Sequence, residues 1–199
     1  MANEVTICNL ALTSLGADHI SSLNDNNTTA ELCKTYYDTV RDAVIESAFW
    51  TFATVEAVSE TQERTPWGDK YKHVIPQDWL KVERVYRSIS RSGNTVSDGW
   101  YRQGNYVYSY DPVVYLWGTQ SITNTNKFPA LFHLLLSARM AVELCIAITE
   151  DKTMLGHKWT EYGQKLADAK NSDAIQAANE QIQSNTLIDA RSGGGRGIS

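Results

Sequence analysis

Cysteine is scarce in this chain, and the few cysteines follow no metal-binding spacing. Among 199 residues only Cys8, Cys33 and Cys145 are cysteines, and no two of them form a Cys-x-x-Cys pair. Each lies in an apolar pattern of helical spacing, which is typical of reduced, buried thiols in a protein made in the cytosol. The sequence therefore predicts no disulfide framework, no metal site and no cofactor.

Positive charge is also in short supply. The chain has 18 lysines and arginines against 23 acidic residues, which gives a formal net charge of −5. Tight binding of nucleic acid phosphates over a whole surface needs a clear excess of cations. The balance excludes such a protein. It is compatible with a conduit that double-stranded DNA passes without specific binding, because an acidic wall repels phosphate.

The sequence also gives no sign of a signal peptide or of a membrane-spanning segment. The first residues lack the basic segment and apolar run of a signal peptide, so none is expected. The most apolar stretch, residues 128–149, is long enough to span a membrane but contains His133, Arg139 and Glu143. Buried helices of bundles look the same, so we expect a core helix, a hydrogen-bonded core or interface role for His133, and no membrane span.

Motifs of catalysis are not evident. The glycine run 193–197 lacks the lysine and the flanking strand of a phosphate-binding loop, and no Gly-x-Ser-x-Gly motif occurs. The four histidines share no metal-ligand spacing: His19, His73, His133 and His157. A glycosidase needs only two nearby carboxylates, and nothing selects a pair among Glu56, Glu60, Glu63, Asp69, Asp78 and Glu83. We predict that the protein is not an enzyme.

Helical periodicity is the strongest positive signal. Apolar spacing predicts four helices, at about residues 3–15, 28–47, 129–148 and 151–183. Gly16 suits the C-cap of the first helix, Thr28 to Glu31 resembles a capping box opening the second, and Pro129 suits the first position of the third. The third helix is apolar on nearly every side, so we expect it to be central. Its expected packing residues are Phe132, Leu135, Leu136, Val142, Leu144 and Ile146.

The middle of the chain has a different character. Runs rich in β-branched and aromatic residues predict strands at about residues 51–58, 80–89, 101–110 and 113–117, with turns between them. The predicted class is α+β. Residues 1–50 and 126–183 form an antiparallel bundle of about four helices, residues 51–125 form an inserted β-rich lobe, and residues 184–199 form an extended C-terminal arm.

Aromatic residues are abundant, with six tryptophans and ten tyrosines, and many lie within the expected β lobe. They can fill a small lobe and pair across its strands. They can also stay exposed as anchors at protein interfaces, or stack on carbohydrate. A lobe of this size cannot bury all of them, so we expect a mixture of buried and exposed rings.

One dense pattern resembles a known family. Leu15-Gly16 and a polar loop precede residues 30–45, which read Ala-x-x-Cys-x-x-Tyr-Tyr-x-x-x-Arg-Asp-x-x-Ile and are soon followed by Ala48-Phe49-Trp50-Thr51-Phe52-Ala53. Tyr71 to Leu80 and Phe128-Pro129 then follow in order. Over residues 3 to 180 this order and spacing resembles the tail tubular protein A family of short-tailed bacteriophages (podoviruses), the head-to-tail adaptors.

The resemblance implies a structural virion protein with no catalytic residues. Such adaptors form a twelve-fold homo-oligomeric ring on the portal protein, and the tail nozzle protein (tubular protein B) attaches below. Tail fibres bind around the junction, and double-stranded DNA passes through the centre during genome ejection. The implied location is the virion tail or neck, assembled in the host cytoplasm. One alternative is a carbohydrate-binding or carbohydrate-hydrolysing tail module that uses the aromatic β lobe. Another is a generic intracellular α+β binding protein of the host.

The C-terminal arm is the predicted partner contact. Residues 184–199 have few apolar side chains and a glycine run that loses much entropy on ordering, so a neighbouring subunit or the portal is expected to hold them. In this hypothesis Leu187, Ile188 and Ile198 are apolar anchors. Arg191 and Arg196 pair with acidic groups of the partner.

Overall fold

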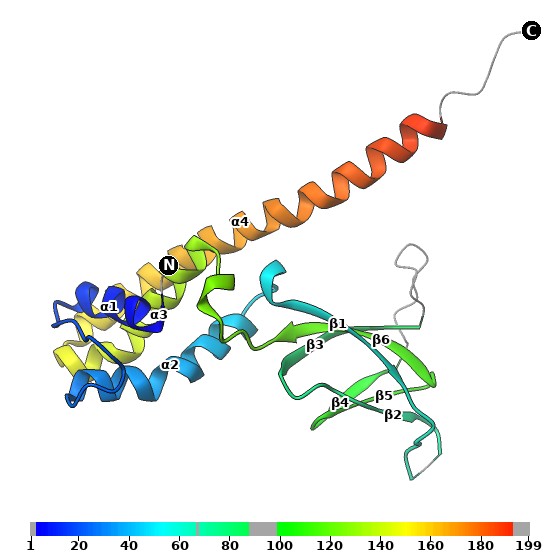
Figure 1. Cartoon of the computed structure of the whole chain (residues 1–199), viewed down its shortest axis with the longest axis horizontal. Coiled ribbons are helices and arrows are strands. Elements are labelled where there is room, and N and C mark those ends of the chain that lie inside the picture. Colours follow the sequence, from blue (N-terminus) through cyan, green and yellow to red (C-terminus); the bar gives the residue numbers. More distant parts are fainter. Residues whose placement is uncertain (1–2, 67, 88–98, 193–199) are drawn as a thin grey trace, which may run out of the picture.

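The computed structural model describes residues 3–66, 68–87 and 99–192, with the side chains of residues 177–192 left aside. Figure 1 shows a helical part built from both ends of the chain, a β lobe beside it, and one long helix that leaves the molecule. Four α-helices and two small antiparallel sheets confirm the α+β class among the described residues.

Two helices open the chain. α1 (Glu4–Leu15) ends at Gly16, whose φ of 72° is the left-handed conformation expected of a C-cap. α2 (Thr28–Glu46) begins one residue earlier than the capping-box prediction requires, because that prediction makes Thr28 the N-cap. Its N-cap is Asn27, whose side chain accepts a hydrogen bond from the Ala30 backbone N–H at 2.7 Å. Asparagine is as good a cap as threonine, so the neighbouring Asn27 took the position.

Two more helices follow the β lobe. α3 (Ala130–Thr149) starts just after Pro129, which is the N-cap with an extended ψ of 154° rather than the first helical residue. α4 (Lys152–Ser192) is 41 residues long. Its first half packs along α3, and Arg139 of α3 lies over the rings of Trp159 and Tyr162 at 4.5 and 5.4 Å.

The helical core is centred on α3, which contacts α1, α2 and α4. Five of the six predicted packing residues are buried, among them Leu135, Leu136 and Leu144 with no exposed surface. The prediction for Ile146 was wrong, since this side chain is 42% exposed. Residues 146–149 form the last turn of α3, and none of these four is buried.

Length and composition alone would let α3 cross a membrane, and it is the one helix among the described residues of which this is true. Its mean hydropathy is 1.8, and 56% of the apolar stretch is buried inside the protein. This burial is what a central core helix requires.

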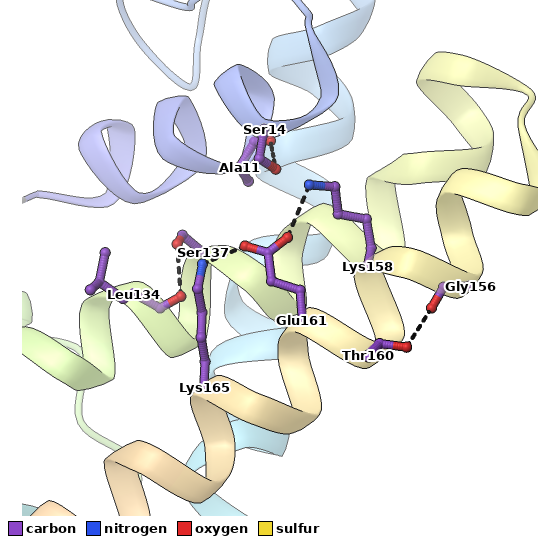
Figure 2. Close-up of polar contacts among 9 residues, drawn as sticks. All are labelled: Ala11, Ser14, Leu134, Ser137, Gly156, Lys158, Thr160, Glu161 and Lys165. Atoms are coloured by element: carbon purple, nitrogen blue, oxygen red, sulfur yellow. Dashed lines mark hydrogen bonds and ion pairs between the residues drawn. The ribbon is translucent and has the colours of Figure 1, made fainter.

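Polar contacts where α1, α3 and α4 meet are local to each helix (Figure 2). Glu161 accepts hydrogen bonds from Lys165 at 2.7 Å and from Lys158 at 3.0 Å, all on α4. These two ammonium groups, Lys165 first, lower the pKa of the Glu161 carboxyl. Nearby hydroxyls such as Ser137 donate to carbonyls of their own helix, so this cluster is structural.

The described part of the β lobe consists of two three-stranded sheets. The first has the order β1 (Thr54–Glu60), β6 (Val113–Gln120), β3 (Trp79–Tyr86), and the second has the order β2 (Tyr71–Val74), β5 (Tyr106–Ser109), β4 (Tyr101–Gln103). All neighbouring strands are antiparallel. A second core between the sheets contains Val82, Val85, Val107, Val114 and Leu116.

Several strand predictions need correction. Thr51–Ala53 is a 3-10 turn (η1) rather than the start of a strand, and β1 begins after it. The single strand expected at 101–110 is two strands, separated by a turn at Gly104 with φ 58°. β2 was not predicted as a strand, and β6 continues past the expected end to Gln120. Residues 88–89 of the expected strand 80–89 lie outside the described residues.

Polar contacts join the helical part to the β lobe at two points among the described residues. The Asp173 carboxylate of α4 accepts from the Thr51 backbone N–H at 3.0 Å and from the Thr51 hydroxyl at 2.7 Å. Asp42 of α2 accepts from the Ser121 hydroxyl at 2.7 Å and also pairs with buried Arg41. Both contacts fix the point where the chain enters or leaves the lobe.

The second half of α4 runs away from every other element (Figure 1). Asp173 is the last buried residue described on this helix, and Ile175 is already 64% exposed. The prediction of an extended arm from residue 184 was wrong for 184–192, which continue the helix. Within 184–192 Leu187, Ala190 and Arg191 are good helix formers, and no proline or glycine interrupts the segment before Gly193.

Candidate interaction surfaces

Side chains suited to catalysis or metal binding are dispersed over the described part of the chain. Within residues 3–66, 68–87 and 99–176, whose side chains the structure describes, no three His, Cys, Asp or Glu side chains are grouped to hold a metal ion. Several acidic residues of the β lobe form local ion pairs, Glu63 with Lys72 at 2.7 Å and Glu83 with Lys81 at 2.8 Å. These carboxylates are accounted for by structural contacts.

His73 is the most enclosed histidine and has a structural environment. It lies on β2 with no exposed surface, and its ring nitrogens lie 3.2 Å from the Ser59 hydroxyl and 3.0 Å from the Asp111 carbonyl. Burial lowers the pKa of His73. His133 is half-buried with its ring 5.7 Å from that of Phe128, and burial lowers its pKa too.

The three cysteines are free and buried, as predicted. Cys8 of α1 and Cys33 of α2 are neighbours, and the hydrogen bond between them together with burial raises the pKa of Cys8. A raised pKa disfavours the thiolate, which is the reactive form of cysteine. Cys8 therefore behaves as a packing residue.

One groove opens where α4 passes the start of α3. It has a volume of about 220 Å³ and is lined by apolar side chains that include Trp50, Phe132 and Ala169. Its acidic residue, Asp173, is already bonded to Thr51. The groove therefore offers apolar surface beside a carboxylate that already accepts hydrogen bonds from Thr51.

The most organised surface lies on the outer side of the β2-β5-β4 sheet. We call it the Tyr–Lys face, and it consists of Lys70, Lys72, Tyr101, Tyr106, Tyr108 and Tyr110. Tyr101 and Tyr108 stack with ring centroids 5.0 Å apart. The ammonium of Lys70 lies 4.4 Å from the Tyr101 ring and 4.8 Å from the Tyr110 ring. Lys72 lies 4.2 Å above the Tyr106 ring.

Strand alternation explains why these rings point outward. His73, Val107 and Ser109 occupy the inner side of the sheet and have no exposed surface. Residues one position away, such as Tyr106 and Tyr108, therefore lie on the outer side. The sequence showed this period of two for the tyrosines but carried no signal for Lys70 or Lys72, which reach the rings through strand pairing.

A second aromatic group covers the outer side of the other sheet. Trp117 of β6 packs edge-on against Phe49 at 5.4 Å and beside Tyr86 at 6.2 Å, with the Arg84 guanidinium 5.3 Å from its ring. Phe49 is 44% exposed. Both outer sides of the β lobe thus present aromatic rings with cations, as the expectation of partly exposed rings anticipated.

The predicted partner-contact residues fall at the far end of the chain. Leu187, Ile188 and Arg191 lie in the outer half of α4, where the structure describes the helical backbone alone. Arg196 and Ile198 lie outside the described residues.

No protein-family model matches this chain, and no curated protein matches it in sequence.

Proposed function

We propose that this chain is a structural virion protein, a head-to-tail adaptor whose ring joins the portal protein to the tail nozzle protein and forms part of the DNA ejection channel. The outer half of α4 is the observation that carries the proposal. A single helix of this length is only marginally stable in water, because most helix stability in proteins comes from packing against other elements. A helix that leaves its own protein therefore implies a partner that packs against it.

The arrangement of the chain supports the same role. Helices from both ends of the chain and two small antiparallel sheets between them agree with the α+β layout predicted from the sequence. Aromatic rings with cations on two outer surfaces suit the side contacts between ring subunits, where tyrosine, tryptophan and arginine concentrate binding energy. The proposed ring has twelve copies, tail fibres bind around it, and double-stranded DNA passes without specific binding.

The carbohydrate alternative has less support. Sugars stack on open aromatic faces, whereas the Lys70 and Lys72 ammonium groups already lie over rings of Tyr101, Tyr106 and Tyr110. Retention on immobilised host glycans, or release of sugar from them, would favour this alternative over the adaptor.

Deleting residues 184–199 tests the proposal. The packed part of α4 lies before this segment, so the truncated protein should keep its fold and melting temperature. It should lose attachment when co-expressed with the portal protein encoded in the same genome, measured by co-purification. Two double variants test whether the apolar side chains make the attachment. Leu187→Ser/Ile188→Ser should weaken attachment, while the control Gln181→Ser/Gln183→Ser should not. A truncated chain that attaches as well as the full chain would show that the end of α4 is not an attachment arm.

A further inference from the structure

The Tyr–Lys face is left uncovered by its own chain. Tyr101 and Tyr110 are 42% and 53% exposed, and Val74 at the edge of the same sheet is 62% exposed. Tyrosine offers a large contact area at a low entropy cost, since only two torsions must be fixed on binding. The stacked Tyr101–Tyr108 pair and the lysines over the rings hold these side chains in place before any partner arrives.

The charge of this face is positive. Lys70 donates a hydrogen bond to the Gly99 carbonyl at 2.6 Å and contacts rings, and it forms no direct ion pair within the described residues. The neighbouring Asp69 carboxyl, whose pKa the Thr65 hydroxyl and Lys70 help to lower, offsets part of its charge. Lys72 pairs with Glu63. None of the β2, β4 or β5 residues is acidic. A partner for this face must therefore present negative charge.

The same chain carries such a surface. The first 50 residues hold seven acidic residues and two basic ones, so the whole net charge of −5 arises there, and the remaining residues are balanced. Four of these acids lie along α2 at helical spacing, and we call them the acidic α2 face: Glu31, Asp38, Asp42 and Glu46. Asp42 is half-buried and the other three are exposed. The exposed Lys34 lies between Glu31 and Asp38, and the face still carries more negative than positive charge. Asp38 and Asp42 pair with buried Arg41, while no ion pair with Glu31 or Glu46 occurs in the described part of the chain.

The two faces lie on different parts of the molecule. Figure 1 shows α2 in the helical part and the β2-β5-β4 sheet in the β lobe, below the β1-β6-β3 sheet in this view. Faces of opposite charge at separate positions cannot satisfy each other within one chain. They can do so between successive copies, and such head-to-tail contacts build rings.

We propose that the Tyr–Lys face of one copy binds the acidic α2 face of a second copy. This inference rests on the proposed function, because it names the contact that links neighbouring subunits of the adaptor ring. A symmetric pairing of two Tyr–Lys faces or two α2 faces would place like charges together, which costs affinity. The contact is therefore head to tail, and raising the salt concentration weakens it.

Two variants of the full chain test this contact by complementation. Lys70→Glu/Tyr110→Ser alters the Tyr–Lys face, and Glu31→Lys/Glu46→Lys alters the acidic α2 face. Both pairs of substitutions avoid the ion pairs of Arg41 and Lys72. In sedimentation velocity at low salt, the wild-type chain should form a concentration-dependent series of oligomers. Each variant alone should associate at least about tenfold more weakly, because like charges meet.

Mixing the two variants should give a 1:1 dimer that grows no further, because each variant keeps the face that the other lacks. Lys127→Glu, which reverses an exposed lysine outside both faces, should associate like the wild type. A mixture that stays monomeric would overturn the inference, as would a variant that associates alone as strongly as the wild type. Circular dichroism melting confirms that each variant is folded.

Portal binding separates failure of this inference from failure of the proposed function. If the chain attaches to portals but the mixed variants form no dimer, the adaptor role stands and this contact is wrong. If the mixed variants dimerise but the chain never attaches to a portal, the contact stands and the adaptor role is wrong.

Discussion

At the scale of single residues, Gly118 leaves the least room for a Cβ atom among the glycines that the structure describes. A Cβ atom there would lie 2.2 Å from the Lys81 carbonyl oxygen of β3 and 2.7 Å from the Trp79 ring. The two strands would have to move apart, so Gly118→Ala should lower the free energy of unfolding by about 3 kcal/mol. Chemical denaturation measures this change.

Gly156 is the matched control for Gly118. It lies in α4 with open space where a Cβ would go, and alanine is the better helix former. Gly156→Ala should therefore raise the free energy of unfolding by up to about 1 kcal/mol. Equal stability of the two alanine variants would contradict the packing of Trp79 on β6.

Burial of His73 predicts a pH dependence of stability. In the unfolded chain a histidine titrates near about pH 6.5, and burial lowers the pKa of His73 in the folded protein. The unfolded state therefore binds more protons between these two pKa values. The stabilising contribution is complete above the unfolded pKa and is lost as the pH falls toward the folded pKa.

His73→Gln should flatten this dependence. The free energy of unfolding, measured from neutral pH downward, should fall less steeply for His73→Gln than for the wild type. His19→Gln, at an exposed position, should keep the wild-type slope. A wild-type slope in the His73 variant would show that this histidine does not couple protons to folding.

Features of single residues could be predicted from the sequence where their cause is local, and could not where it depends on distant parts of the chain. The Gly16 cap follows from the residue itself, and so did the burial of the cysteines in apolar helical patterns. The contact of Lys70 with Tyr101 depends on how β2, β5 and β4 pair, and strand pairing leaves no local signal. The choice of Asn27 over Thr28 as a cap was ambiguous because both residue types serve equally well.

At the scale of secondary-structure elements, helices were easier to predict than strands. The helices carry apolar periodicity over many turns, and all four were placed within a few residues, except that α4 continues to Ser192. β2 has four residues, too few to establish a period, and it exists because β5 pairs with it. The sequence predicted one strand over residues 101–110, because tyrosines occur along the whole segment. The turn at Gly104 divides it into β4 and β5.

The central place of α3 gives a sharp test by substitution. Leu136 has no exposed surface, so Leu136→Asp buries an unpaired charge and should abolish folding. Leu134, two residues away on the same helix, is 42% exposed, and Leu134→Asp should leave the protein folded. Helix content by circular dichroism and solubility distinguish the two. A folded Leu136→Asp protein would mean that α3 is not the core helix.

At the scale of the whole molecule, composition and pattern predicted the α+β class but not the shape. An extended arm was expected at the C-terminus, whereas α4 carries the chain outward as a helix to Ser192. Its sequence is compatible with either state, since polar and alanine-rich segments form helices chiefly when packed or continued from a helix that is packed. The sequence shows that the excess negative charge lies in the first 50 residues. It does not show that Lys70 and the tyrosines form a positively charged face elsewhere in the fold.

Imaging the protein together with its portal tests the adaptor role most directly. The chain, co-expressed with the portal protein of the same genome and viewed by negative-stain electron microscopy, should form a twelve-fold ring stacked on the portal with an open central channel. Portals that remain bare while the folded chain stays separate would contradict the adaptor role.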